Sequence, residues 1–147
     1  MAVKRVVALG IAMLAAAALV VDAERGAGGG PLAAPFDART YRRGDDVLRL
    51  AVSRSPLAPL RAARVDLMSQ QVMVQPQELR RYGAVTCLLH HDALGKGAVP
   101  SASSTRTIEC QRTSHILSVS ATALSPSLQA DPRRVAGVVD QAFQDLR

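Results

Sequence analysis

The chain has 147 residues and a formal charge of +6 at pH 7, from 18 Lys or Arg and 12 Asp or Glu. Its length suits one small domain, and with few aromatic residues and no Trp the core must be built from aliphatic side chains. The arginines occur in scattered pairs with no aromatic platform among them, which argues against nucleic acid as a partner. Positive side chains spread in this way usually form a solvated surface. If they have a function, it would be to attract an acidic protein or an anionic component of a cell envelope.

Residues 1–23 have the pattern of a secretory signal peptide. Lys4 and Arg5 form a positive start, and an uncharged apolar run follows over residues 6–21. A membrane-spanning helix needs about 20 residues, and this run is shorter. Ala23 completes a motif of small residues that a signal peptidase can cleave. We therefore expect cleavage after about Ala23 and a protein that is secreted or held in the cell envelope. Contact with the membrane would require that the N-terminal segment stay uncleaved.

Residues 24–35 are rich in Gly and Ala and show no periodicity, which predicts a flexible tether. Residues 36–147 then form a single small α+β domain. Near its start, residues 45–52 alternate between polar and apolar side chains, as a half-buried strand does. The excess of Arg, Ala and Val over the whole chain is typical of a bacterium with a GC-rich genome.

The next stretch is less distinctive. Residues 59–71 begin with Pro and place apolar side chains on one stripe, which favours a helix. The choice between helix and strand for residues 60–74 stays open, with a strand over residues 65–74 as the alternative. Residues 76–83 begin with Pro and end with Gly83, a pattern typical of a short helical turn with a left-handed cap.

The centre of the predicted fold is a set of three adjacent antiparallel strands. Apolar and polar residues alternate over residues 106–112 and 115–121, and residues 84–91 are rich in β-branched and apolar side chains. The first two strands are separated by residues 92–105, a Gly-, Pro- and Ser-containing loop that we expect to be exposed and mobile. Residues 113–114 form the short turn between the last two strands.

Two independent assumptions, that Cys87 pairs with Cys110 and that residues 113–114 form a two-residue turn, each set a strand register. Pairing Cys87 with Cys110 places Leu89 opposite Ile108, and the two-residue turn places Cys110 opposite Leu117. Both registers put the same apolar set on one face: Val85, Cys87, Leu89, Ile108, Cys110, Leu117 and Val119. The other face carries a polar set: Thr86, His90, Thr107, Glu109, Gln111, Ser118 and Ser120. A slip of one residue would mix the two sets, so their agreement favours the sheet.

The two cysteines are expected to form a disulfide. They face each other in the predicted register, and an exported protein meets oxidising conditions. Closing the loop between Cys87 and Cys110 would contribute roughly 3 kcal/mol on a chain-entropy estimate. Two buried free thiols would be the interpretation for a cytosolic protein.

The last element has the strongest helical pattern. Asp131 is a candidate N-cap, Pro132 stands in the first turn, and the apolar residues that follow share one stripe. This stripe is expected to pack on the apolar sheet face. The predicted fold is therefore an α+β domain: an antiparallel sheet of about four strands, with the C-terminal helix and one further helix on one face, and one disulfide.

Three histidines and a carboxylate suggest a metal site, but strand geometry argues against it. His90 and His91 are neighbours on a strand and point to opposite faces, while His91 and His115 lie at opposite ends of the predicted sheet, roughly 20 Å apart at about 3.3 Å per residue. Asp92 adds one more potential ligand without closing that gap. We therefore expect no metal and no other cofactor.

Catalytic motifs are also missing from the sequence. There is no Ser in a G-x-S-x-G elbow, and both cysteines are assigned to the bridge. The adjacent carboxylates Asp45 and Asp46 follow Gly44, where a turn or cap explains them. Gly28, Gly29 and Gly30 lie in the tether, without the strand and helix that a phosphate-binding loop needs. The sequence thus predicts a protein that is not an enzyme.

The resulting functional hypothesis is an exported, non-catalytic binding or accessory module of the bacterial cell envelope or extracellular space. Its expected contact surface combines the loop over residues 92–105, which contains Lys96, with the polar sheet face around His90, Glu109 and Gln111. The partner would be an unknown protein or an anionic envelope component.

Two alternatives from other classes remain open. One is a secreted protease inhibitor that presents the loop over residues 92–105 to its target. The other is a small hydrolase that uses His90, Asp92 or Glu109.

Overall fold

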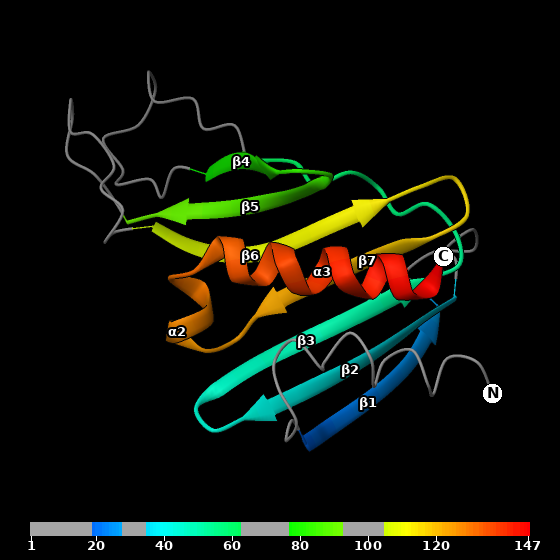
Figure 1. Cartoon of the computed structure of the whole chain (residues 1–147), viewed down its shortest axis with the longest axis horizontal. Coiled ribbons are helices and arrows are strands. Elements are labelled where there is room, and N and C mark those ends of the chain that lie inside the picture. The colour runs from blue at the N-terminus through cyan, green and yellow to red at the C-terminus, as the bar shows by residue number, and fades with distance from the viewer. Residues whose placement is uncertain (1–18, 28–34, 63–76, 93–104) are drawn as a thin grey trace.

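A computed structural model of the chain describes residues 19–27, 35–62, 77–92 and 105–147. These residues form one antiparallel sheet of seven strands in the order β1-β2-β3-β7-β6-β5-β4, crossed on one face by a long C-terminal helix (Figure 1). The strands are β1 (Leu19–Ala27), β2 (Pro35–Arg43), β3 (Asp46–Ser53), β4 (Gln77–Tyr82), β5 (Val85–His91), β6 (Thr105–Thr113) and β7 (Ser118–Ala123). The helices are α2 (Pro126–Gln129) and α3 (Pro132–Leu146).

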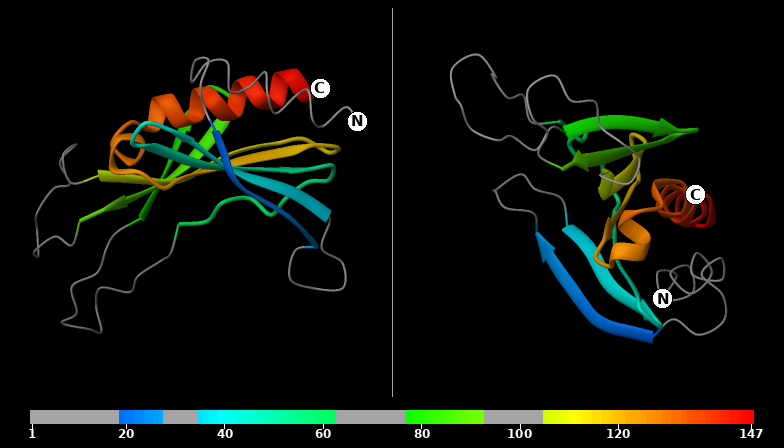
Figure 2. Two further views of the ribbon diagram at one scale, coloured as in Figure 1. Left: turned by 90° about the horizontal axis from the view of Figure 1, so that it is seen from below. Right: turned by 90° about the vertical axis from the view of Figure 1, so that its left-hand side faces the viewer.

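The hydrophobic core lies between α3 and the sheet. Figure 2 shows α3 on one side of the twisted sheet, above the middle strands. The stripe predicted for this helix is buried, and so are the inward-facing residues of β3, β5, β6 and β7 beneath it. Fully or almost fully buried members of this core include Leu48, Leu50, Val85, Leu89, Val119, Ala121, Val135, Val139, Ala142 and Phe143. The helix begins as predicted, because the side chain of Asp131 accepts a hydrogen bond from the backbone N–H of Arg134.

Polar contacts fix the direction of α3 on the sheet. The guanidinium of Arg112 on β6 pairs with Asp140 at 2.5 Å and lies 4.2 Å from the ring centroid of Phe143. At the end of the helix, Arg54 donates a hydrogen bond to the carbonyl oxygen of Leu146 at 3.3 Å. A cation at this position also interacts favourably with the negative end of the helix dipole.

The predicted class is confirmed, but the predicted strand count was too low. The antiparallel sheet, the C-terminal helix and the disulfide are all present, while β1, β2 and β4 add strands that the sequence patterns did not predict. Residues 76–83 were wrongly predicted as a helical turn. Gly83 does adopt a left-handed φ of 62°, but it forms the two-residue turn of the β4–β5 hairpin, where Tyr82 pairs with Val85.

The predicted β5–β6 register is correct from Thr86 to Leu88 and changes beyond Leu88. Cys87 pairs with Cys110 as predicted, but an irregularity between Leu88 and Leu89 places Leu89 opposite Thr107 instead of Ile108. Such a bulge reverses the facing of the residues beyond it. Thr107 therefore joins the helix-facing side, where it is fully buried.

The β6–β7 register differs from the prediction by an even number of residues. Cys110 lies opposite Ala121 and not Leu117, because β6 continues through Thr113 and the connection closes with a hydrogen bond from the N–H of Ser114 to the carbonyl of Leu117 at 2.7 Å. An even shift preserves the facing of every side chain. The predicted polar set on β7 therefore still faces away from α3.

The N-terminal boundaries predicted from sequence fall inside strands. β1 runs through Ala23, the predicted cleavage point, and residues 24–27 of the predicted tether pair with β2. Residues 1–18 and 28–34 lie outside the described part of the chain. The valines of β1 favour extended backbone, and its pairing with β2 explains why these residues form a strand.

The segment after β3 crosses the sheet face opposite α3. The hydroxyl of Ser118 accepts from the N–H of Leu57 and donates to the carbonyl of Ser55, both at 2.9 Å. Gln111 donates to the carbonyl of Ala58 at 3.2 Å. The predicted helix over residues 59–71 is not present where the chain is described, up to residue 62, and the rest of it lies outside the described residues.

Candidate functional site

A chain of hydrogen-bonded side chains joins β4, β5 and β6 on the helix-facing side. His91 is only 5% exposed, and both of its ring nitrogens have partners. Its Nδ1 lies 2.8 Å from Oγ1 of Thr105, and its Nε2 lies 2.9 Å from Oε2 of Glu78. If Nε2 carries a proton it donates to the carboxylate, and an unprotonated Nδ1 can then accept from the threonine hydroxyl.

Arg80 completes the network through the carboxylate of Glu78. Its Nε and Nη2 donate to the two carboxylate oxygens of Glu78 at 2.9 and 3.1 Å. These hydrogen bonds hold the pKa of Glu78 below its usual value, and the hydrogen bond with His91 acts in the same direction, against the opposing effect of burial. Glu78 is therefore a carboxylate at neutral pH, suited to accept from the imidazole.

This arrangement has both structural and chemical consequences. Residues 91 and 105 flank the long β5–β6 connection, so the bond from His91 to Thr105 closes the base of that connection. A hydroxyl, an imidazole and a carboxylate in series are also the components of an activated nucleophile, in which the base abstracts a proton and the acid orients the base. The fully buried hydroxyl of Thr107, which finds no hydrogen-bond partner among the described residues, lies on the same face of β6.

The three histidines and Asp92, considered above as metal ligands, do not come together in the structure. His90 and His91 face opposite sides of the sheet, and His90 contacts Gln77 through Nε2 at 2.5 Å. Asp92 is exposed and lies 3.7 Å from Arg106. His115 is exposed beyond the end of β6. Within the described ranges, no three His, Cys, Asp or Glu side chains come close enough to hold one metal ion.

The predicted contact surface is only partly available. His90 and Glu109 are half-buried on the sheet face opposite α3, and Glu109 makes no hydrogen bond or ion pair with another described residue. Gln111, by contrast, is 7% exposed, and its side-chain amide donates to the carbonyl of Ala58 and to the hydroxyl of Thr113. The crossing segment therefore occupies its amide. Lys96 and the loop over residues 93–104 lie outside the described residues.

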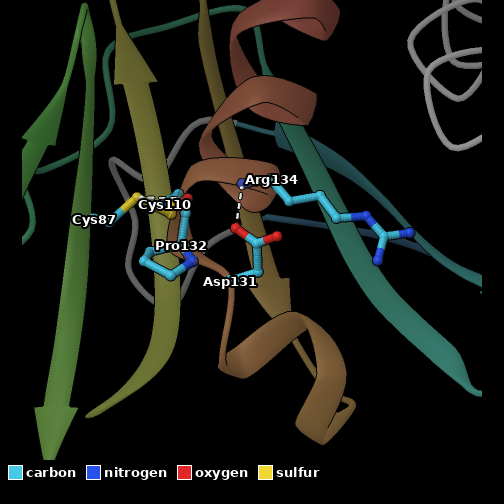
Figure 3. The surroundings of a disulfide bond; sticks show 5 residues. All are labelled: Cys87, Cys110, Asp131, Pro132 and Arg134. Carbon is cyan, nitrogen blue, oxygen red and sulfur yellow. Dashed lines mark hydrogen bonds between the residues drawn. A yellow bond between two sulfur atoms is a disulfide. The ribbon is translucent and has the colours of Figure 1, made fainter. Parts of the chain in front are cut away.

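The predicted disulfide is confirmed and lies under the start of α3. Cys87 and Cys110 are both fully buried, and Figure 3 shows Pro132 beside the bridge, with Asp131 capping the helix next to it. The carbonyl oxygen of Pro132 is 4.0 Å from Sγ of Cys87. The bridge therefore joins β5 to β6 where the helix begins.

Two members of the polar network were missed from sequence. Glu78 was placed on a helical turn, so its position next to His91 could not be anticipated, and Thr105 was counted as a loop residue. One sequence feature could have indicated their positions. Gly83 lies between two segments that both tolerate extended backbone, and this pattern is also typical of a β-hairpin. A hairpin at that point brings Glu78 and Leu89 opposite each other.

Comparison of the chain with known protein families, with curated proteins and with solved structures finds no match. In the part of the chain that the structure describes, no helix has the length and apolar character needed to cross a membrane. The functional argument therefore depends on the sequence patterns, the disulfide and the geometry of the site.

Proposed function

We propose that this chain is an exported, non-catalytic binding or accessory domain of a bacterial envelope or of the extracellular space. The observation that carries the proposal is the Cys87–Cys110 bridge, with both residues fully buried. Disulfides persist in oxidising compartments and are rare in the cytosol, so the bridge supports export. The signal-like pattern of residues 1–23 supports the same conclusion independently.

Cell fractionation with mass spectrometry tests the compartment. Free thiols are blocked at lysis, and the intact mass of the chain is then measured in each fraction. We expect the chain in the envelope or extracellular fraction, with neither thiol blocked and an N-terminus near Glu24. A cytosolic protein with both thiols blocked would contradict export.

The binding surface in this proposal is the open part of the face opposite α3. Glu109 supports it, because a half-buried carboxylate without a partner in the described structure is available to a cationic or hydrogen-bond-donating group. His90 lies on the same face of the neighbouring strand. The favoured partner is a protein with basic or amide groups at the contact.

Site-specific photo-crosslinking in living cells tests this surface. A photoreactive residue at position 109 should capture one protein partner, whereas the same residue at Gln144, on the exposed side of α3, should not. Capture of lipid or polysaccharide from position 109 would identify an anionic envelope component instead. Equal products from both positions, or none from position 109, would contradict the assigned surface.

A second candidate function is favoured by the Thr105–His91–Glu78 series: hydrolysis of an ester through an acyl-threonine. In this reaction, Oγ1 of Thr105 attacks the ester carbonyl and its proton passes to Nδ1 of His91. The alcohol then leaves with that proton, and water cleaves the acyl-threonine ester to release the acid. These catalytic residues are not the ones considered from sequence. In the described structure, His90, Asp92 and Glu109 are not hydrogen-bonded to one another.

Ester hydrolysis and covalent labelling test the second candidate. A hydrolase should turn over short aryl esters and react with a fluorophosphonate probe at Thr105. Thr105→Val and His91→Gln should abolish both signals, while Thr113→Val, at an exposed threonine of the same strand, should leave them unchanged. Absence of turnover and of labelling in the folded, oxidised protein would leave the non-catalytic proposal as the favoured one.

A further inference from the structure

Within the described part of the chain, the edge strand β4 has a neighbouring strand on one side only. β4 is the last strand in the sheet order and pairs with β5 alone among the described strands (Figure 1). The backbone N–H and C=O groups on the other side of an edge strand can pair with a further strand. Leu79, at the middle of β4, is 41% exposed and faces away from α3, while Arg80 and Arg81 beside it are also exposed.

The residues of β4 are complementary to themselves when two copies run antiparallel. With Leu79 opposite the second copy's Leu79, Glu78 meets the second copy's Arg80, and Arg80 meets the second copy's Glu78. Residues that are directly opposite in an antiparallel pair lie on the same face. The two leucines therefore meet on the face away from α3, and the four charged groups gather on the helix-facing side.

We propose that two copies of this chain pair edge to edge through β4, about a two-fold axis at Leu79, to form a sheet that is continuous across both copies. This is addition of a strand to an open edge, with a second copy as its occupant. The proposal is independent of the exported role proposed above.

The charges select this register over its neighbours. A two-fold axis perpendicular to the sheet keeps each face on its own side, so symmetric registers differ by steps of two residues. One step in one direction places Arg80 opposite the second copy's Arg80, and one step in the other places Glu78 opposite the second copy's Glu78. Directly opposed like charges are destabilising, whereas opposite charges are stabilising.

The same ion pair exists within one copy, where Nε of Arg80 lies 2.9 Å from Oε1 of Glu78. In the pair of copies, each carboxylate would lie between two guanidinium groups, and each guanidinium between two carboxylates. A single pair of six-residue strands is small compared with a standard protein interface. The association is therefore weak and depends on concentration, and its two-fold symmetry closes the β4 edge against further growth.

Sedimentation equilibrium of the oxidised protein over a wide concentration range tests the pairing. The unmodified chain should show a monomer–dimer equilibrium. Leu79→Arg should raise the dissociation constant about tenfold or more, because it places two further like charges at the axis. The matched control is Leu124→Arg, since Leu124 is similarly exposed, at 47%, and lies outside β4; it should leave the dissociation constant unchanged.

A charge exchange tests the register. Arg80→Glu alone opposes carboxylates across the axis, and Glu78→Arg alone opposes guanidinium groups, so each variant should remain monomeric. Mixed together, the two variants restore both opposite-charge pairs and should form a heterodimer. Because Glu78 also contacts His91, circular dichroism melts are needed to show that each variant is folded.

A cross-link gives a second readout that does not depend on charge. Leu79→Cys should form a disulfide-linked dimer on mild oxidation, since the described residues include no free cysteine that would compete, whereas Leu124→Cys should not. A chain that stays monomeric at all concentrations, a mixture of folded charge variants that does not associate, or association unchanged by Leu79→Arg would each overturn the proposal.

Discussion

Replacing Thr107 with Val should stabilise the domain, although it removes a polar group. Thr107 is fully buried on the helix-facing side opposite Leu89, and its hydroxyl has no hydrogen-bond partner among the described residues. Burying a polar group without a hydrogen-bond partner lowers the free energy of unfolding by about 1–3 kcal/mol, because the group loses its hydrogen bonds to water. Val has the same shape and favours strands, so we expect Thr107→Val to raise the free energy of unfolding by about 1–2 kcal/mol.

Urea unfolding of the oxidised protein measures this gain. The midpoint should move to higher urea with an unchanged slope, because the surface exposed on unfolding stays the same. A domain of this size gains roughly 4 °C in melting temperature for each kcal/mol, so a thermal melt gives an independent reading.

The matched control is Thr86→Val on β5. Thr86 is half-exposed on the opposite face, so its hydroxyl remains in contact with water and the expected change is within about 0.5 kcal/mol. A loss of about 1 kcal/mol or more in Thr107→Val would refute the reasoning. It would mean that the hydroxyl has a partner, or that the bulge at Leu89 does not turn Thr107 toward the helix.

Three further predictions follow from the same contacts. Replacing both Cys87 and Cys110 with Ala should lower the free energy of unfolding in urea by about 3 kcal/mol, because the unfolded chain regains the freedom of the closed loop; a loss below about 1 kcal/mol would contradict a stabilising bridge. Val139→Ala should cost about 2 kcal/mol, because it leaves a cavity in the fully buried face of α3, whereas an unchanged thermal midpoint would show that the helix is not packed as described. The hydrogen bond from Ser127, followed by that from Arg134, lowers the pKa of Asp46 below its usual 3.8, so its stabilisation is complete above that value and is lost as the pH falls through the lowered pKa. Asp46→Asn should therefore reduce stability at neutral pH and flatten its decline below about pH 5 in melts over a pH series, and an unchanged acid limb would argue against this contact.

Pairing through β4 would change how the proposed binding surface is presented. The two-fold axis is perpendicular to the sheet, so the faces opposite α3 in the two copies lie on the same side. His90 and Glu109 of both copies would then be exposed in one direction, and a partner with repeated sites could engage both at once. Binding to two linked sites increases the apparent affinity without any new contact.

Local patterns were sufficient to predict two parts of this protein. The C-terminal helix is specified by its apolar stripe and by the Asp131 cap, both of which act within a few residues along the chain. The pairing of Cys87 with Cys110 was assumed and was supported by the alternation of the strands that carry them, because side chains on a strand alternate with a strict period of two. These features led to the correct fold class and the correct disulfide.

Local sequence patterns could not predict the candidate site. Residues 76–83 have end signals that suit a short helix, and only the partner β5 makes them a strand, because backbone pairing to a neighbouring strand outweighs weak local preference. Glu78 reaches His91 only through that pairing.

The amino-acid sequence alone determined the elements whose stabilising contacts are local: the helix α3, the strands around Cys87 and Cys110, and the alternation of their faces. The tertiary structure decided the extent of the sheet, the bulge that turns Thr107 inward, and the segment that covers Gln111. The physical reason is that each of these depends on which distant backbone lies alongside, and a one-dimensional pattern contains no information about that neighbour.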